Sequence, residues 1–169
     1  MTIFRKKLNS FTAVIAFLIG VSAAQAGEVV DDLDMERYRG QVVLVDFWAS
    51  WCAPCRRSFP WMDEMQRKYR DRGLVIVAVN EDNAWLDAEQ FLADYPADID
   101  IVRDSRGELA KQYDLQAMPS SFLYDRAGNL VHRQYGFKVR DVESYETVLV
   151  ELLGRQLSDE IETIERNKP

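Results

Sequence analysis

Cysteine and histidine, the usual ligands of structural zinc, are scarce in this sequence. Among its 169 residues are only 2 cysteines, Cys52 and Cys55, and 1 histidine, His132. A structural zinc site needs four Cys or His ligands, so these residues cannot complete one. We therefore expect His132 to be an ordinary strand residue, and we expect no metal and no cofactor beyond a Cys52–Cys55 disulfide.

An excess of basic charge is also missing. Lysine and arginine number 21 against 28 acidic residues, which gives a formal net charge of −7. Nucleic-acid-binding domains usually carry a basic patch, and none is evident, so we expect no nucleic acid partner. The length, with 47% hydrophobic and 29% charged residues, suits one globular domain with a sizeable core, and we expect a monomer.

A hydrophobic run long enough to span a membrane is missing as well. The apolar run over residues 11–21 is short, follows basic residues at 5–7 and precedes Ala-Gln-Ala at 24–26. This arrangement is typical of a secretory signal peptide with its cleavage site. Residues 1–26 are therefore predicted to direct export and to be removed. An uncleaved N-terminal membrane anchor is the alternative.

Strand-like and helix-like patterns alternate along the rest of the chain. Apolar runs predict strands over 42–48, 74–79, 99–103, 121–124 and 130–135, and helical spacing predicts helices over 54–70, 85–95, 109–113 and up to a C-cap at Gly154. Residues 27–40 are expected to be an irregular arm or short strand, and residues 155–169 a polar C-terminal tail. The order predicts an α/β fold with a central mixed sheet flanked by helices.

The two cysteines stand where the first apolar run meets the first helix, in Trp51-Cys52-Ala53-Pro54-Cys55. A helix N-terminus stabilises a thiolate through its free N–H groups and its dipole. The second sulfur lies one turn further along and can close a small disulfide. The pair can then exchange two electrons with a disulfide of another protein. An inert structural disulfide is a weaker interpretation, because so small a ring constrains little of the chain.

Two segments resemble the thioredoxin superfamily. Residues 45–55, VDFWASWCAPC, resemble its active-site segment, and residues 117–125, AMPSSFLYD, resemble the segment that carries its cis-proline. With the export signal and an insert around residues 81–98, the chain is most similar to the TlpA/ResA/CcmG branch of exported bacterial thioredoxins. The resemblance covers about residues 36–154. It implies a thioredoxin-like fold over a domain predicted to span 27–154.

The resemblance also implies roles for residues around the cysteines. Cys52 would be the exposed nucleophile and Cys55 the resolving thiol that attacks the mixed disulfide. Trp51 and Pro54 would shape the surface around the sulfurs, and Pro54 suits a first helical turn because it lacks an N–H. Packing of Trp51 in the core is the alternative for that residue.

Three further residues are carried over for client binding. Pro119 would be the cis-proline beside Cys52, although a trans proline that starts a strand would have the same sequence. The backbone of Met118 would pair with an incoming peptide as an added strand. Gly136 matches a family glycine on the same face, and a plain turn glycine would look identical.

Asp46 is the most informative polar residue, because ionising a carboxylate inside an apolar central strand is costly. The resemblance places it at the family position of a buried acid that exchanges a proton with Cys55. An Asp bonded to backbone near a strand edge is the alternative. Two positions depart from family patterns: Ala78 stands where thioredoxin has a lysine, and Ser58 stands where the branch often has a glutamate.

The resemblance implies a thiol-disulfide oxidoreductase of the periplasm. Because the Ala53-Pro54 dipeptide lacks the histidine of strongly oxidising relatives, we expect a reductant of disulfides in envelope proteins. Clients of the cytochrome c maturation or copper-protein assembly type and a membrane thiol donor of the DsbD/CcdA type are implied. Alternatives are a copper metallochaperone using Cys52, Cys55 and Met118, or a disulfide oxidase. The acidic segment 81–83 is expected to be a solvated loop rather than a metal site.

Overall fold

A computed structural model of the chain describes residues 29–30 and 32–166, with side chains described from residue 32 to residue 154. The predicted signal peptide, residues 1–26, lies outside the described residues. Within the described ranges, no helix combines the length and the apolar character needed to cross a bilayer.

Six strands form one mixed sheet in the order β1-β4-β3-β2-β5-β6. Their bounds are Val29–Val30 (β1), Val42–Trp48 (β2), Leu74–Asn80 (β3), Asp100–Arg103 (β4), Ser120–Tyr124 (β5) and Leu130–Tyr135 (β6). The first four strands pair in parallel, and β5 and β6 add antiparallel pairs. The predicted α/β fold with a central mixed sheet is confirmed.

Strand β2 lies inside this sheet, with β3 on one side and β5 on the other. All of its residues are buried, as expected of an apolar run that is covered on both faces. Its last residue, Trp48, brings the chain to the carboxyl edge of the parallel strands. The segment with the two cysteines begins at that edge.

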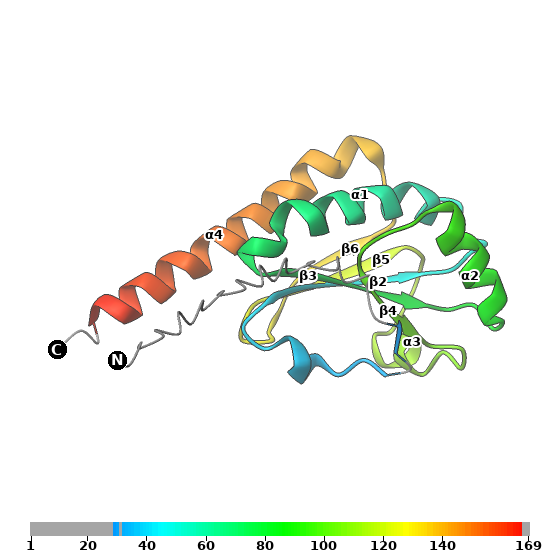
Figure 1. Cartoon of the computed structure of the whole chain (residues 1–169), viewed down its shortest axis with the longest axis horizontal. Helices are drawn as coiled ribbons and strands as arrows, with labels where there is room; N and C mark the ends of the chain where they lie inside the picture. Colours follow the sequence, from blue (N-terminus) through cyan, green and yellow to red (C-terminus); the bar gives the residue numbers. More distant parts are fainter. Residues whose placement is uncertain (1–28, 31, 167–169) are drawn as a thin grey trace, which may run out of the picture.

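Helices cover both faces of the sheet. Their bounds are Cys55–Tyr69 (α1), Trp85–Asp94 (α2), Glu108–Gln112 (α3) and Val142–Arg166 (α4), with a 3₁₀ turn (η1) at Met35–Tyr38. Figure 1 shows α1 and α4 over one face and α3 on the opposite side. Helix α2 joins the α1 side, because Phe91 packs against Trp48 and Phe59, with ring centroids 4.7 and 4.8 Å apart.

Alternation along β2 divides the core into two clusters. Leu44 and Trp48 belong to the cluster under α1, α2 and α4, which also contains both cysteines. The residues between them, such as Val45 and Phe47, belong to the cluster on the α3 side. Asp46 falls in step with Leu44 and Trp48, so its side chain enters the cluster that contains the cysteines.

Helix α1 matches the predicted helix over 54–70 to within one residue at each end. Its apolar stripe is buried, namely Phe59, Met62, Met65 and Tyr69. After a short 3₁₀ turn the chain reverses at Gly73, whose φ of 86° is in the left-handed region. Glycine adopts this conformation without a Cβ clash, so the sequence signal for the end of the helix is reliable here.

The prediction that the last helix ends at Gly154 is wrong. Helix α4 continues through Gly154 to Arg166, so much of the predicted polar tail is helical. Gly154 is absent from the glycines with positive φ, so it forms no left-handed cap. An interior glycine costs a helix only about 1 kcal/mol relative to alanine, and the fully buried Leu149 and Leu153 anchor this part of α4.

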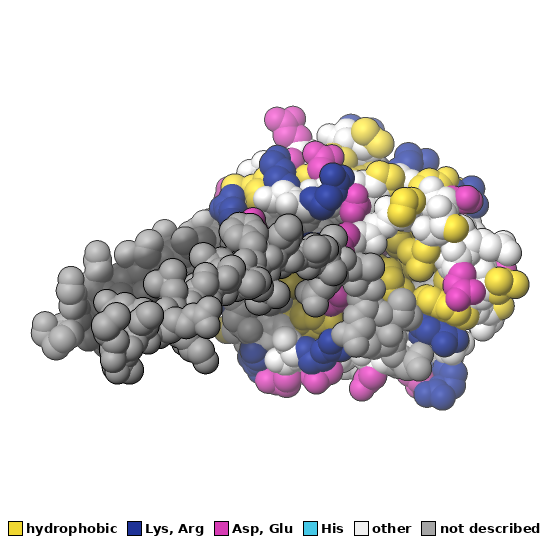
Figure 2. Space-filling model, in the orientation of Figure 1, with side chains coloured by type: hydrophobic (Ala, Val, Ile, Leu, Met, Phe, Trp, Pro, Cys, Tyr) yellow, Lys and Arg dark blue, Asp and Glu magenta, His cyan; other side chains and the backbone are white. Residues whose placement is uncertain are grey.

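Charged side chains of both signs are interspersed on the face of the molecule drawn in Figure 2. Hydrophobic side chains gather toward the end of the molecule where α1 begins and α2 lies. On the described part of this face, no broad area carries basic side chains alone.

Candidate active site

The two cysteines lie in a tight turn between β2 and α1. The backbone N–H of Cys52 donates to the carbonyl of Ala49 at 3.0 Å, and that of Cys55 donates to the carbonyl of Cys52 at 3.1 Å. The sulfurs form a disulfide with an S–S distance of 2.05 Å and Cα atoms 5.3 Å apart. Because Cys55 is the first residue of α1, both sulfurs lie at the positive end of the helix dipole.

The two sulfurs differ in their access to solvent. Cys52 retains 4% exposure, whereas Cys55 is fully buried. A shallow pocket of about 490 Å³ opens beside Cys52 and is lined by Trp51, Cys52, Ala53, Pro54, Leu115, Gln116, Ala117 and Met118. Trp51 is 66% exposed, so it does not fill the core, and it forms part of the rim of this pocket.

The second wall of the pocket belongs to the segment before β5. The Met118–Pro119 peptide bond is cis. Pro119 accepts a hydrogen bond from the backbone N–H of Gly136 at 2.7 Å. Gly136 has a φ of 73°, and a Cβ built on it would meet nothing within 4 Å. Backbone conformation, rather than a lack of space in the free protein, therefore favours glycine at this position.

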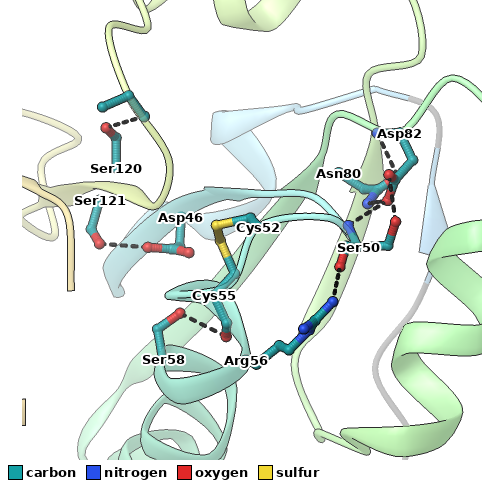
Figure 3. Close-up of a disulfide and its surroundings, with 11 residues drawn as sticks. Asp46, Ser50, Cys52, Cys55, Arg56, Ser58, Asn80, Asp82, Ser120 and Ser121 are labelled. Atoms are coloured by element: carbon teal, nitrogen blue, oxygen red, sulfur yellow. Dashed lines mark hydrogen bonds between the residues drawn. A yellow bond between two sulfur atoms is a disulfide. The ribbon is translucent and has the colours of Figure 1, made fainter. Parts of the chain in front are cut away.

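Asp46 lies in the protein interior beneath the disulfide. It is 2% exposed, and Figure 3 shows its carboxylate pointing toward the sulfurs. The Ser121 hydroxyl donates to its Oδ2 at 2.5 Å, whereas Oδ1 has no partner among the described residues. Burial raises the pKa of Asp46 and the hydrogen bond from Ser121 offsets part of the rise, which leaves the pKa at about 7. Asp46 can therefore gain or lose a proton near neutral pH.

The two positions that depart from the family pattern supply no charge near Asp46. Ala78 is its neighbour in register on β3, so no cation stands on that strand. Ser58 is buried on α1 and donates to the backbone carbonyl of Cys55 at 3.1 Å. Since neither Ala78 nor Ser58 can ionise, Asp46 is the candidate proton acceptor for Cys55.

The expectation that residues 81–83 form a solvated loop is wrong for Asp82, which is 4% exposed. Its carboxylate accepts hydrogen bonds from the Ser50 N–H at 2.9 Å, the Ser50 hydroxyl at 2.8 Å and the Asn80 amide at 2.8 Å. Figure 3 shows this group beside the disulfide turn. Asp82 therefore fixes the loop that leads into Cys52.

The neighbouring Glu81 is half-buried and faces Asp104. Burial, the charge of Asp104 and a hydrogen bond with Asp104 together raise the pKa of Glu81 to about 8. Asp104 in turn accepts bonds from the backbone N–H groups of Glu108 and Ala110, each at 2.8 Å. These contacts tie the loop after β3 to the start of α3.

His132 lies on β6. Its ring stands 5.8 Å from that of Tyr145, between centroids. Among the described residues, no group of three or more His, Cys, Asp or Glu side chains is placed to hold a metal ion.

Sequence reasoning brought Asp46, Cys52, Cys55 and Pro119 into one site, but missed Asp82. A signal for Asp82 did exist. Residues 80–82, Asn-Glu-Asp, directly follow a buried parallel strand, and the carboxyl ends of neighbouring parallel strands share one edge of a sheet. That edge is also where the loop to Cys52 begins, so polar residues there could have been assigned to it.

Comparisons with known proteins agree with this geometry. A family model described as Redoxin matches residues 10–149. The thiol-disulfide oxidoreductase ResA of Geobacillus thermodenitrificans is 32% identical over 127 residues, which cover 72% of this chain and 72% of that protein. ResA of Bacillus thuringiensis is 29% identical over 114 residues, covering 67% of this chain and 66% of that protein. The chain thus spans just under two thirds of the latter relative.

Solved structures show the same likeness. A candidate thiol:disulfide interchange protein DsbE from Chlorobium tepidum has a TM-score of 0.69 and 44% identity, over 70% of this chain and 84% of that chain. StoA from Bacillus subtilis has a TM-score of 0.56 and 28% identity, over 64% of this chain and 82% of that chain. The ResA and DsbE relatives are named for thiol–disulfide chemistry.

Proposed function

This chain belongs to the Redoxin family of thioredoxin-like oxidoreductases, and we propose that it reduces disulfides of proteins in the bacterial cell envelope. The observation that carries this proposal is the position of the Cys52–Cys55 disulfide. It lies at the start of α1, with Cys52 on the wall of an open pocket and Cys55 buried above Asp46.

Reduction of a client disulfide follows in two steps from this arrangement. The Cys52 thiolate, stabilised by the N-terminus of α1, attacks one client sulfur and releases the other as a thiolate that takes up a proton. Cys55 then gives its proton to the Asp46 carboxylate and attacks the sulfur of Cys52. The client leaves as a dithiol after both its thiolates are protonated, and the enzyme keeps the two-electron oxidation as its Cys52–Cys55 disulfide.

The proposed direction of electron flow rests on the charges around Cys52. Ala53 and Pro54 between the cysteines carry no charge. Arg56 is exposed, and its guanidinium donates to the backbone carbonyl of Ser50 at 3.3 Å, where water screens it. Without a nearby buried cation, the Cys52 thiolate has only the N-terminus of α1 to stabilise it in the reduced enzyme, and this favours the transfer of electrons to clients.

A client peptide would lie along the pocket beside Cys52. The exposed Trp51 offers an apolar surface, and Met118, before the start of β5, could pair its backbone with an extended peptide. In this proposal the protein is an exported periplasmic monomer, or is held at the membrane by an uncleaved N-terminus. Its clients are of the cytochrome c maturation or copper-protein assembly type, and a DsbD/CcdA-type membrane thiol donor reduces it again.

Trapping of reaction intermediates tests the assignment of the two cysteines. Cys55→Ser should hold a long-lived mixed disulfide between Cys52 and a model client such as insulin, whereas Cys52→Ser should abolish reduction and trap nothing. The double variant Cys52→Ser/Cys55→Ser is the negative control. If Cys52→Ser forms the trapped complex and Cys55→Ser does not, the nucleophile is Cys55 and the assignment is reversed.

Measurements on the wild-type protein separate the proposed function from its alternatives. A reductase turns over insulin when a thiol donor is supplied. Binding of one Cu(I) at high affinity, with no turnover, would instead establish a metallochaperone that uses the cysteines and Met118. Oxidation of a reduced client by the Cys52–Cys55 disulfide, which is itself reduced, with no turnover of insulin, would establish an oxidase.

A further inference from the structure

Three polar side chains form a row across the sheet on the α1 and α4 side. Asp46 on β2 is paired with Ser121 on β5, and Ser121 is paired with Gln134 on β6. Residues in register on neighbouring strands point to the same face. On the other side of Asp46 the neighbour is Ala78 of β3. The polar row therefore leads from Asp46 in one direction only, toward the β6 edge.

The row ends at a small pocket between β6 and α4. The pocket has a volume of about 120 Å³ and is lined by His132, Gln134, Gly136, Phe137, Lys138, Asp141, Val142, Ser144, Tyr145 and Val148. It is separate from the pocket beside Cys52, because the two share no lining residue. Gln134 is half-buried, so the polar row emerges here.

Tyr145 of α4 joins the row to this pocket. It is 7% exposed, and its ring stacks on Trp61 with centroids 5.0 Å apart. Its hydroxyl is buried and makes no hydrogen bond with a described residue. Burial raises the pKa of Tyr145 and the charge of Asp46 also raises it, whereas the neighbouring Ser121 hydroxyl lowers it. The phenol hydroxyl thus lies close to Ser121, with its hydrogen-bonding capacity unused.

We propose that Ser121 and Tyr145 are positioning residues that pass the proton of Asp46 to solvent through the pocket between β6 and α4. This inference rests on the proposed function, because the proton is the one that Asp46 accepts from Cys55. Asp46 Oδ1 and the Tyr145 hydroxyl are both buried and have no hydrogen-bond partner among the described residues.

The proton transfer needs only solvent water as the final proton acceptor. While Asp46 is ionised, the Ser121 hydroxyl donates to Oδ2, as in Figure 3. After Asp46 has taken the proton of Cys55, it passes this proton to the oxygen of Ser121. Ser121 passes its own hydroxyl hydrogen to the Tyr145 oxygen, and Tyr145 gives its hydrogen to solvent water at the pocket. One proton moves outward and no electron moves, so Asp46 is ionised again for the next turnover.

Among the described residues, the polar side chains recorded as interacting with Asp46 are Ser121 and Tyr145. Helix α1 presents Cys55 and Ser58, and the Ser58 hydroxyl is engaged with a backbone carbonyl. Strand β3 presents Ala78, and α4 presents Tyr145. Burial and the Ser121 hydrogen bond are the influences on the pKa of Asp46, so no cation of the described chain takes part.

Reaction of the reduced protein with Ellman's disulfide tests the route without a natural client. Attack by Cys52 releases one coloured thiolate, and attack by Cys55 releases a second, so each step is measured in the same trace. Ser121→Ala should slow the second release about tenfold near neutral pH and move its pH midpoint upward, because Asp46 must first lose its proton through this route before it can accept the proton of Cys55. Ser121→Thr keeps a hydroxyl and should restore both. Tyr145→Phe keeps the ring and should also slow the second release.

Ser120→Ala is the matched control. Ser120 is a fully buried serine on the same strand, and its hydroxyl donates to the carbonyl of Ala117 at 2.6 Å rather than to Asp46. It should leave the second release and its pH midpoint unchanged. The proposal is overturned if Ser121→Ala and Tyr145→Phe both release the second thiolate at the wild-type rate. It is also overturned if the rate stays slow in Ser121→Thr, or if Ser120→Ala is slowed as well. Failure to reduce insulin would instead overturn the proposed function alone.

Discussion

Asp82 holds Ser50 by two hydrogen bonds, one from the backbone N–H at 2.9 Å and one from the hydroxyl at 2.8 Å. Ser50 lies two residues before Cys52, and Asp82 comes from the loop after the neighbouring strand β3. The insert around residues 81–98 thereby makes a direct contact with the redox turn. The conformation of the residues before Cys52 depends on this carboxylate.

Asp82→Ala should lower the free energy of unfolding and slow the attack by Cys52. The substitution leaves buried donors of Ser50 and Asn80 without their acceptor, which costs about 2–3 kcal/mol. Denaturant unfolding and the first release from Ellman's disulfide measure the two effects. Glu89→Gln, an exposed change on α2, is the control. A free energy of unfolding within about 0.5 kcal/mol of wild type would mean that the loop does not need Asp82.

Asp46→Asn should change how stability depends on pH. The pKa of Asp46 is about 7 in the folded protein and near 3.8 when unfolded, so the fold favours the protonated acid. Stability is then greatest below the unfolded pKa and falls by about 1.4 kcal/mol per pH unit until the folded pKa is passed. The Asn variant lacks this fall and should be more stable by up to about 4 kcal/mol in alkaline buffer.

Thermal or denaturant unfolding across this pH range checks the effect, with single-turnover kinetics beside it. The Asn variant should also slow the second release, because Cys55 has lost its proton acceptor. Parallel stability curves for the two proteins, or a less stable variant with normal turnover, would make Asp46 a structural residue. The proton of Cys55 would then leave by another route.

The reduction potential of the Cys52–Cys55 couple should lie below about −200 mV, nearer to thioredoxin than to DsbA. The dipeptide Ala53-Pro54 supplies no cation that would stabilise the reduced form. Equilibration with glutathione buffers, followed by alkylation and mass analysis, gives the potential. A value close to that of DsbA, about −120 mV, would make the protein an oxidant of its clients.

Gly136→Ala should destabilise the protein by about 1–2 kcal/mol. The φ of 73° at Gly136 disfavours a Cβ, although the surrounding space is open. The strain falls on the residue that bonds to Pro119, so insulin reduction should weaken as well. Gly154→Ala is the comparison, because this helical glycine also has open space and alanine there should stabilise α4 by about 1 kcal/mol. If both substitutions changed the free energy of unfolding equally, the positive φ of Gly136 would not be the cause of the destabilisation.

The strands and the first helix could be predicted from the sequence because their signals are local. The apolar run at 42–48 and the spacing along α1 each depend on neighbouring residues, and both elements formed within a residue of the predicted bounds. The end of α4 could not be predicted in the same way. A glycine such as Gly154 ends a helix only where the chain must turn, and that requirement is set by the tertiary fold.

The residues of the candidate site also divide into those with local sequence signals and those set by the tertiary fold. Cys52, Cys55 and Asp46 lie within ten residues of one another, and their chemistry shows in a short segment. The partners of this segment come from far along the chain: Ser121 is 75 residues from Asp46, and Asp82 is 32 residues from Ser50. A serine in a strand has many uses, so only the register of β2 with β5 identifies Ser121 as the partner of the acid.

The enclosed position of β2 has a consequence for motion at the site. A strand that is hydrogen-bonded along both edges and covered on both faces exchanges its amide hydrogens only when most of the domain opens. Asp46 belongs to that strand, whereas Trp51 and Met118 stand on exposed connecting segments. The proton acceptor is thus fixed in the slowest-exchanging part of the molecule, and adjustment to clients of different shape falls to the fast-exchanging rim.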